Sequence, residues 1–266
     1  MVEQPSNGAP ARIIAIPRLA AAGRWRVEAL RSISEPLLLW FTRGQGRATV
    51  AGITRGYGPH NAIFIPPGVM HGYEVSQHVF GTAVFFGPGC TLPLPATPQH
   101  LRVRDSAAQA ELTALIEAAQ READGDKPGR ARAVLHTLGL MSVWIERQVA
   151  AQPPEPARPD ATRRLVQKYT ALLERDFRSG MGVGDYAAAL DVTPTHLSRV
   201  CRQTCGRPAS ALLQDRKLFE ARRLLAETEM PVNEVSRSLG FTSAAYFTRA
   251  FQHRTGKTPT AFRKTP

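Results

Sequence analysis

The sequence lacks long hydrophobic runs, has few cysteines and carries few acidic residues in its C-terminal part. Its longest apolar stretches, such as Pro36 to Phe41, fall far short of the roughly 20 residues that a membrane-spanning helix needs. The N-terminus contains an acidic residue and two prolines and has no cationic start, so we expect no secretory signal. These absences exclude a membrane-spanning protein and predict a cytoplasmic one.

The chain has three cysteines, Cys90, Cys201 and Cys205. This number is small and odd, which does not suit a disulfide framework. Cys201 and Cys205 are four residues apart, so they would share one face of a helix and could form half of a metal site. No second His/Cys pair accompanies them. We therefore expect reduced, packed thiols and no metal or other cofactor.

The net charge of +12 over 266 residues is unevenly distributed. Residues 161–266 contain 18 Lys/Arg and 9 Asp/Glu, so this part alone contributes +9. A basic excess confined to one segment favours a polyanionic partner, either nucleic acid or an anionic membrane surface.

Apolar and turn-forming residues divide the chain into an N-terminal β part and a C-terminal helical part. Between Arg24 and Gly87, short apolar runs beginning with "WRVEAL" alternate with Gly and Pro, which predicts antiparallel strands in a small barrel or sandwich. Two amphipathic segments, 105–123 and 129–151, predict helices that bury one face on the barrel or on a partner chain. The predicted fold class is α+β with two domains. The expected parts are a flexible tail (1–11), a β barrel (12–100), a helical region (101–151), a proline-rich linker (152–160) and a basic helical domain (161–266).

The C-terminal part contains an internal repeat. "THLSRVCRQTCGR" from Thr195 and "AYFTRAFQHRTGK" from Ala245 align with each other, and Arg199 matches Arg249. Each copy follows a short helical segment and a tight turn, which is the plan of a helix-turn-helix unit. Thr193 in the first copy, and Thr242 or Ser243 in the second, is suited to cap the second helix of its unit.

The outward faces of the two repeated helices contain no Asp or Glu, as a helix that faces phosphates requires. Arginine can bind guanine, and Gln or Thr can bond base edges or phosphates. Tyr246, Phe247, Ala250 and Phe251 are expected to face the core. The candidate DNA contacts are Thr195, His196, Ser198, Arg199, Arg202 and Gln203 in the first unit, and Ala245, Thr248, Arg249, Gln252 and His253 in the second.

The C-terminal hundred residues resemble the DNA-binding domain of the AraC/XylS family of bacterial transcription regulators. The resemblance is densest over "VNEVSRSLGFTSAAYFTRAFQHRTGKTPTAFRK". It implies two helix-turn-helix units joined by a long helix, with the second helix of each in adjacent major grooves of double-stranded DNA. We also expect a homodimer that forms through the helices of residues 105–151, and RNA polymerase as a further partner. Ala244 and Ala245 stand where the family often has larger polar residues, so we expect the first unit to supply more of the sequence selectivity.

The β part resembles a cupin barrel in "IPPGVMH", whose His71 matches one metal ligand of the cupin motif. The chain has no HxH sequence to supply the other ligands, so a cupin-type metalloenzyme with a DNA-binding appendage is the alternative to a regulator without enzymatic activity. AraC-type regulators commonly carry a metal-free barrel that holds a small effector. The candidate effector-binding residues are Trp40, Arg47, His71 and Tyr73, and several arginines in this part favour an anionic effector.

Overall fold

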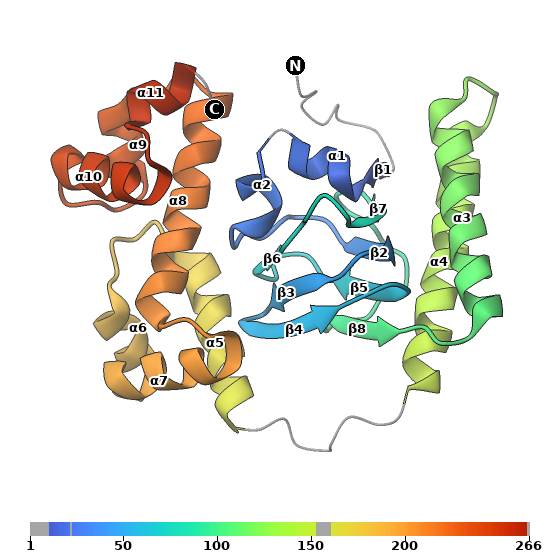
Figure 1. Ribbon diagram of the computed structural model, residues 1–266, viewed down its shortest axis with the longest axis horizontal. Helices are drawn as coiled ribbons and strands as arrows, with labels where there is room; N and C mark the ends of the chain where they lie inside the picture. Colours follow the sequence, from blue (N-terminus) through green and yellow to red (C-terminus); the bar gives the residue numbers. More distant parts are fainter. Residues whose placement is uncertain (1–10, 22, 153–160, 265–266) are drawn as a thin grey trace.

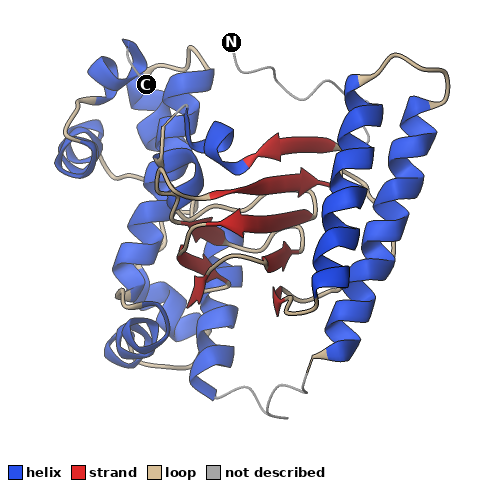
Figure 2. Cartoon of the chain, turned by 45° about the vertical axis from the view of Figure 1, so that its right-hand side comes forward, coloured by secondary structure: helices blue, strands red, loops and turns tan. Residues whose placement is uncertain are grey.

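The computed structural model describes residues 11–21, 23–152 and 161–264. Most of the expected tail and linker lies outside these residues. The predicted two-domain α+β fold is confirmed, with antiparallel sheets followed by a helical domain. The sheets lie between a helical hairpin on one side and the C-terminal helices on the other (Figure 1, Figure 2).

The strands form two antiparallel sheets, one of five strands in the order β1-β7-β2-β5-β8 and one of three in the order β4-β3-β6. Their hydrogen bonds do not join the two sheets into a closed barrel within the described residues. The strands are β1 (Arg12–Ala15), β2 (Leu37–Arg43), β3 (Gly46–Val50), β4 (Ile53–Tyr57), β5 (Asn61–Ile65), β6 (His71–Tyr73), β7 (Phe80–Phe85) and β8 (Gln99–Arg102).

The five-stranded sheet is covered on both faces. Since successive side chains of a strand point to opposite faces, Leu37, Leu39 and Phe41 of β2 face the smaller sheet. Leu38 and Trp40 face the helical hairpin instead. This is why β2 is a nearly continuous apolar run and does not alternate with polar residues.

Two sequence-based expectations differ from the structure. "WRVEAL" was expected to be a strand, but Trp25–Glu28 forms the short helix α2, which follows α1 (Ile16–Ala21). Its Val27 is buried while Trp25 and Arg26 turn towards the C-terminal domain. The expected border between barrel and helical region, at residues 100 and 101, falls inside β8, which pairs with β5.

Helices α3 (Ser106–Asp124) and α4 (Arg130–Ala151) form an antiparallel hairpin against the five-stranded sheet (Figure 1). Asp105 caps α3 by accepting hydrogen bonds from the backbone N–H groups of Ala107 and Ala108. Trp144 of α4 is fully buried, and its Nε1 donates to Ala108 O at 3.0 Å. The chain itself therefore covers the apolar face of α3 and the face of α4 that carries Val134, Leu138 and Met141, whereas Leu135, Leu140 and Val143 of α4 stay exposed.

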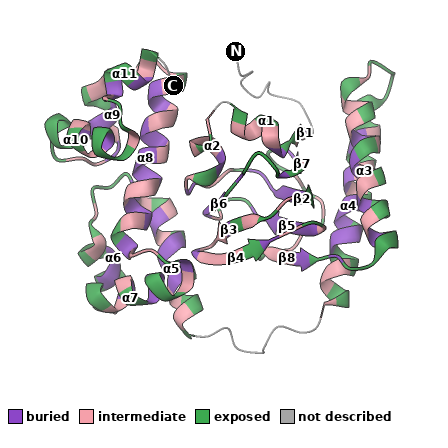
Figure 3. Cartoon of the chain, viewed as in Figure 1, coloured by how far each residue is buried: buried purple, intermediate pink, exposed green. Residues whose placement is uncertain are grey.

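The C-terminal domain is built around the long helix α8, which has more buried residues than any neighbouring helix (Figure 3). Its leucines, among them Leu212, Leu218, Leu224 and Leu225, lie in one core with the surrounding helices. The helices are α5 (Ala161–Asp176), α6 (Val183–Ala189), α7 (Pro194–Cys205), α8 (Ala209–Glu227), α9 (Val232–Ser238), α10 (Ala244–Thr255) and α11 (Pro259–Lys264).

The two domains pack directly on each other. Leu30 and Met70 of the N-terminal domain belong to the same buried cluster as the core of the C-terminal domain. Trp25 packs against Phe219 of α8 and Phe262 of α11, with ring centroids 5.6 and 6.0 Å apart. The N-terminal domain thus shares the core of the helical domain and contacts α8 and α11 directly.

Candidate nucleic-acid interface and effector site

Helices α7 and α10 are alike in length and in both caps. Each has 12 residues. Thr193 Oγ1 accepts a hydrogen bond from His196 N at 3.2 Å, and Ser243 Oγ accepts one from Tyr246 N at 3.1 Å. Of the two residues expected to cap the second helix, Ser243 therefore does so. Each helix ends at a glycine in the left-handed conformation, Gly206 or Gly256.

The turns that precede α7 and α10 have the same shape. Asp191 and Gly240, which follow α6 and α9, both have positive φ angles, of 55° and 66°. After each of them the chain turns back, and Val192 N or Phe241 N donates to a carbonyl of the preceding helix at 3.0 or 3.1 Å. The second turn contains one additional residue before the cap. The repeat in the sequence therefore corresponds to two helix-turn-helix units.

Every candidate DNA contact lies on the accessible side of its helix. The buried side of α7 consists of Leu197, Val200, Cys201 and Cys205, and that of α10 of Phe247 and Phe251. The exposed candidates are Thr195, Arg199, Arg202, Gln203, Ala245, Arg249, Gln252 and His253, while His196, Ser198 and Thr248 are partly exposed. Neither helix carries a carboxylate.

The two matched arginines differ in their local contacts. Arg199 Nη2 donates to His196 Nδ1 at 3.0 Å, which orients the guanidinium along the exposed face of α7. Within the described part of the chain, Arg249 forms no ion pair and no side-chain hydrogen bond. Its guanidinium is available to a partner without breaking a protein contact.

Tyr246 was expected in the core, but its side chain is 47% exposed. It lies in the first turn of α10 and touches Phe241 at a centroid distance of 6.1 Å, while Phe247 fills the buried position beside it. The apolar spacing of Tyr246 and Phe247 does not distinguish the buried ring from the exposed one. Tyr246 therefore adds a phenol to the accessible face of the second unit.

Both thiols of α7 are in the core, as expected. Burial raises the pKa of Cys201 to about 12 and also raises that of Cys205, so both are protonated thiols at neutral pH. Cys205 Sγ donates to Cys201 O at 3.1 Å. In the described residues, no group of three or more His, Cys, Asp or Glu side chains is arranged to hold a metal ion.

A chain of buried charges fixes α8 between the two units. Arg216 of α8 donates through Nε to both carboxylate oxygens of Glu174 on α5, each at 2.8 Å, and its Nη1 lies 3.4 Å from Glu220. Glu220 also accepts hydrogen bonds from Arg178 and Arg223. Several arginines around Glu220 keep its pKa below the usual value despite burial, so the carboxylate is charged.

Comparison with known proteins shows which kind of protein contains such helix-turn-helix units. Residues 186–265 match the family model described as a helix-turn-helix domain. The arabinose operon regulatory protein of Escherichia coli (strain K12) is 25% identical over 230 residues, which cover 83% of this chain and 77% of that protein. The chain is a transcription regulator of the AraC type. Its helix-turn-helix domain is the DNA-binding part.

Two further similarities each cover less than half of this AraC-type regulator. The HTH-type transcriptional regulator GlxA of Rhizobium meliloti (strain 1021) is 28% identical over 130 residues, covering 47% of this chain and 40% of that protein. A solved structure of a transcriptional regulator with an AraC-type DNA-binding domain from Chromobacterium violaceum is 22% identical. It covers 39% of this chain and 92% of that one, with a TM-score of 0.36.

The four candidate effector-binding residues of the regulator do not converge. Trp40 faces the helical hairpin and donates through Nε1 to Thr113 Oγ1 at 3.2 Å. Arg47 is on the outside, where its side chain is 70% exposed and paired with Glu74. His71 and Tyr73 are neighbours on one face of β6, and both are buried.

A third residue, Arg31, joins His71 and Tyr73. The guanidinium of Arg31 lies 5.7 Å from the ring centroid of Tyr73. The backbone groups of Arg31 and His71 exchange two hydrogen bonds, of 2.9 and 2.7 Å. Arg31 is 7% exposed, and within the described residues no carboxylate pairs with it. No sequence pattern pointed to Arg31, because it lies in a loop and far from His71 along the chain.

Within the described residues the polar atoms of this cluster are only partly satisfied, since Arg31 Nη1 donates to Val27 O at 2.9 Å while two other buried atoms have no partner. His71 Nδ1 lies 2.9 Å from Val69 O, to which it donates, while His71 Nε2 and the hydroxyl of Tyr73 are buried without hydrogen-bond partners. Burial, and then the charge of Arg31, lower the pKa of His71 to about 3, so its imidazole is neutral at physiological pH. Burial also raises the pKa of Tyr73, which keeps the phenol protonated. A buried cation thus lies beside one hydrogen-bond acceptor and one donor.

Across residues 11–21, 23–152 and 161–264, none of the helices combines the length and the apolar character that crossing a bilayer requires.

Proposed function

We propose that this regulator binds promoter DNA with α7 and α10 in two successive major grooves on one face of the duplex. The observation that carries the proposal is the recurrence, in the second unit, of a 12-residue capped helix with an exposed arginine and no acidic residue. The 19 residues of α8 give it a length of about 28 Å, close to the ~34 Å repeat of the major groove along B-DNA. Helix α8 can therefore hold the two reading helices about one turn of the duplex apart.

The test is fluorescence anisotropy with duplexes from the region upstream of the gene. Arg199→Ala with Arg249→Ala should weaken binding at least tenfold, because each removes a cation and a donor from a reading helix. The matched control is Arg130→Ala with Arg132→Ala, which likewise removes two exposed cations, here from α4. Equal binding by the double variant and the control would exclude these helices as the DNA contact. The affinity of the wild type should also fall steeply with salt concentration.

The N-terminal domain is proposed to hold a small anionic effector at Arg31, His71 and Tyr73. A buried guanidinium without a carboxylate partner is costly, and the carboxylate of a ligand would compensate it. The unpartnered His71 Nε2 accepts a hydrogen bond and the Tyr73 hydroxyl can donate one, so a hydroxy acid matches the three groups. Trp40 and Arg47, which lie apart from this cluster, are not part of the proposed site.

The same cluster offers a route from the effector to the DNA-binding domain. Arg31 stacks over Phe219 of α8, with its guanidinium carbon 5.8 Å from the ring centroid. Its neighbour Ser32 donates to Glu174 Oε1 at 2.6 Å, and Glu174 in turn holds Arg216. A ligand that moves Arg31 would therefore change contacts at α5 and α8, where the two helix-turn-helix units are joined.

Thermal-shift measurements on the full chain against small hydroxy and keto acids test the effector site. A ligand that binds the native state raises the apparent melting temperature in proportion to the logarithm of its concentration. Arg31→Gln should abolish that shift, whereas Arg47→Gln, which changes an exposed arginine of the same domain, should retain it. A shift retained in Arg31→Gln, or one lost equally in both variants, would count against the site.

A homodimer is proposed to form through the exposed face of α4. Leu135, Leu140 and Val143 are 47, 58 and 37% exposed on this helix, and Arg147 at its edge pairs with Glu111. Apolar side chains gathered on one helix face are typical of an interface. Leu140→Glu should convert a dimer into a monomer in analytical ultracentrifugation, and Glu146→Gln on the same helix should not.

The remaining proposals follow from this assignment. The regulator acts in the cytoplasm, contacts RNA polymerase when bound at a promoter, and has no enzymatic activity or cofactor. Its working parts are the effector-binding domain, the 101–151 helical region with β8 assigned to the sheet, the linker and the DNA-binding domain from residue 161. Purified protein without catalytic metal that still binds its promoter would support a regulator over a cupin-type metalloenzyme.

A further inference from the structure

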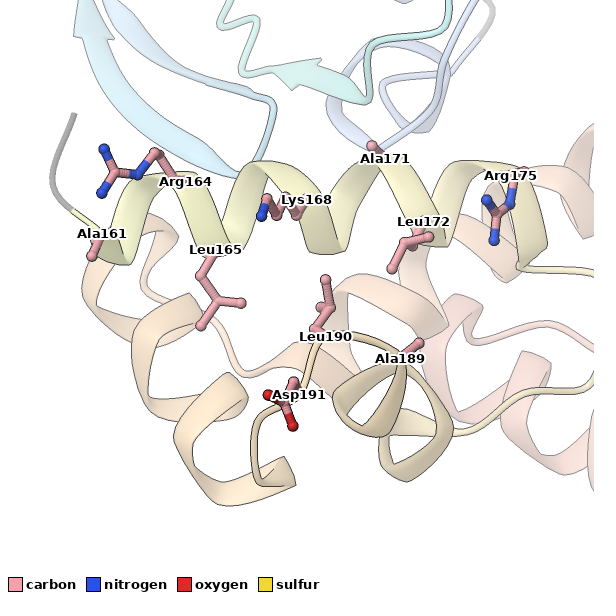
Figure 4. A pocket seen from close by; sticks show the side chains of 10 residues that line it. All are labelled: Ala161, Arg164, Leu165, Lys168, Ala171, Leu172, Arg175, Ala189, Leu190 and Asp191. Atoms are coloured by element: carbon pink, nitrogen blue, oxygen red, sulfur yellow. The ribbon is translucent and has the colours of Figure 1, made fainter. Parts of the chain in front are cut away.

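A groove of about 750 Å³ runs along the first helix-turn-helix unit, between α5 and the turn that joins α6 to α7 (Figure 4). Its floor is apolar. Leu165 and Leu172 of α5 and Leu190 of the turn point towards one another across it (Figure 4). All three pack on the domain core with one side and remain partly open on the other.

The rim of the groove is basic. Arg164 and Lys168, one turn apart on α5, are exposed and line it. Neither forms an ion pair or a side-chain hydrogen bond within the described residues. Arg175 lies at the far end, but its guanidinium is held by Asp176 through contacts of 2.6 to 3.0 Å. Two cations are therefore free beside an apolar floor.

This groove is separate from the DNA-reading surface. None of its lining residues belongs to α7 or α10. A row of leucines has no counterpart in a phosphate backbone, whereas it matches the apolar face of a helix. The chemistry matches a partner that is both apolar and acidic.

We propose that the groove binds an acidic amphipathic helix of another protein. The stretch of α5 from Arg164 to Arg175 extends ~16 Å along the helix axis, which is the length of about three turns of a partner helix. Leucines at i, i+4 and i+7 of that helix would cover Leu165, Leu172 and Leu190, and glutamates along its edge would pair with Arg164 and Lys168. The proposal concerns a second surface and does not depend on how α7 and α10 read DNA.

The probe is a fluorescein-labelled 16-residue peptide with leucines at those positions and glutamates on the flank that faces Arg164 and Lys168, titrated with the full chain in anisotropy measurements. Arg164→Glu with Lys168→Glu should weaken its binding at least tenfold. The control, Arg132→Glu with Arg163→Glu, makes the same change in charge at two exposed cations outside the groove. Ala189→Trp, at an exposed position that lines the groove, should also block the peptide without changing the charge.

Three results of the peptide titrations would overturn the proposal. The peptide does not bind the wild type, it binds the groove variant as well as it binds the control, or Ala189→Trp leaves its affinity unchanged. Each protein is also titrated with the upstream duplex. The groove variant should bind DNA within threefold of the control, and a larger loss would make Arg164 and Lys168 phosphate contacts, which likewise contradicts a protein-docking groove.

Discussion

Gly240 of the second helix-turn-helix unit lies directly against Gly180, in the segment that precedes the first unit. A Cβ atom added at position 240 would be 2.4 Å from Gly180 N and 2.7 Å from Arg178 O. Gly240 also has a φ of 66°, which a side chain tolerates poorly. The contact brings the turn of one unit onto the backbone that leads into the other, so it fixes how the two reading helices are spaced.

Replacing Gly240 with alanine should therefore destabilise the C-terminal domain more than a positive φ alone explains. We expect a loss of roughly 3 kcal/mol in the free energy of unfolding, of which about 1 kcal/mol comes from the backbone conformation and the remainder from the close contact. Gly206→Ala is the control, since Gly206 has a φ of 72° but no atom within 4 Å of an added Cβ. Urea denaturation should separate the two variants, and equal losses would refute the close contact.

Arg199 and Arg249 should differ in their effect on sequence preference. Two alanines, Ala244 and Ala245, precede the contacts of the second unit, so that unit has fewer hydrogen-bonding groups with which to read base edges. Arg199→Ala should reduce discrimination between operator variants, by ~1–3 kcal/mol at the affected base pair. Arg249→Ala should weaken binding more evenly. Affinities for a set of singly substituted operators measure this, and unchanged discrimination in Arg199→Ala would contradict the prediction.

Adjacent aromatic residues on α10 should respond in opposite ways. Phe247 is fully buried and Tyr246 is 47% exposed. Phe247→Ala should cost about 3–5 kcal/mol of stability through the cavity that it leaves. Tyr246→Ala should cost less than ~1 kcal/mol but weaken DNA binding, because it removes a phenol from the reading face. Thermal unfolding and anisotropy measurements on the same two proteins test both statements. A loss of stability in Tyr246→Ala as large as in Phe247→Ala would show that the Tyr246 ring is part of the core, contrary to the prediction.

Stability should decrease as the pH falls below 6.5, partly because of His71. Its pKa is about 3 in the folded protein and 6.5 in the reference state, so the unfolded chain binds the proton more readily. Above pH 6.5 the imidazole is neutral in both states and the free energy of unfolding does not depend on it. As the pH falls from 6.5 towards 3, the unfolded chain takes up a proton that the folded protein does not, so the free energy of unfolding decreases. Between pH 7.5 and pH 5 this amounts to about 2 kcal/mol. His71→Gln should reduce the difference in melting temperature between these pH values; His100, whose pKa burial lowers to about 4, contributes separately.

Trp25 should hold the two domains together more strongly than Arg26 does. The Trp25 ring packs on Phe219 and Phe262, whereas the Arg26–Glu227 pair, at 3.1 Å, is partly exposed. Trp25→Ala should increase the radius of gyration in small-angle scattering by separating the domains. Arg26→Ala, which removes an ion pair worth about 0–1 kcal/mol, should leave the scattering unchanged. Identical profiles for both variants would show that the other interdomain contacts suffice.

Local patterns predicted the helix-turn-helix units well because their determinants are short-range. The start of α7 is set by the capping hydroxyl of Thr193 and by Pro194, and its end by the backbone conformation of Gly206. A hydroxyl cap and a C-terminal glycine recur at α10. The exposed, acid-free faces followed from helical periodicity. The position of Tyr246 could not be predicted, because two neighbouring aromatic residues compete for one buried position and only the surrounding helices decide between them.

The sequence by itself determined the two-part organisation, the antiparallel β part, the repeated units and the basic reading faces, since composition and periodicity act over a few residues. The tertiary structure alone decided which side chains meet. It placed Trp40 and Tyr73 on opposite faces of the β part, brought Arg31 to the distant His71, and packed Trp25 on α8. These contacts depend on strand register and domain packing, in which a shift of one residue exchanges the two faces of a strand.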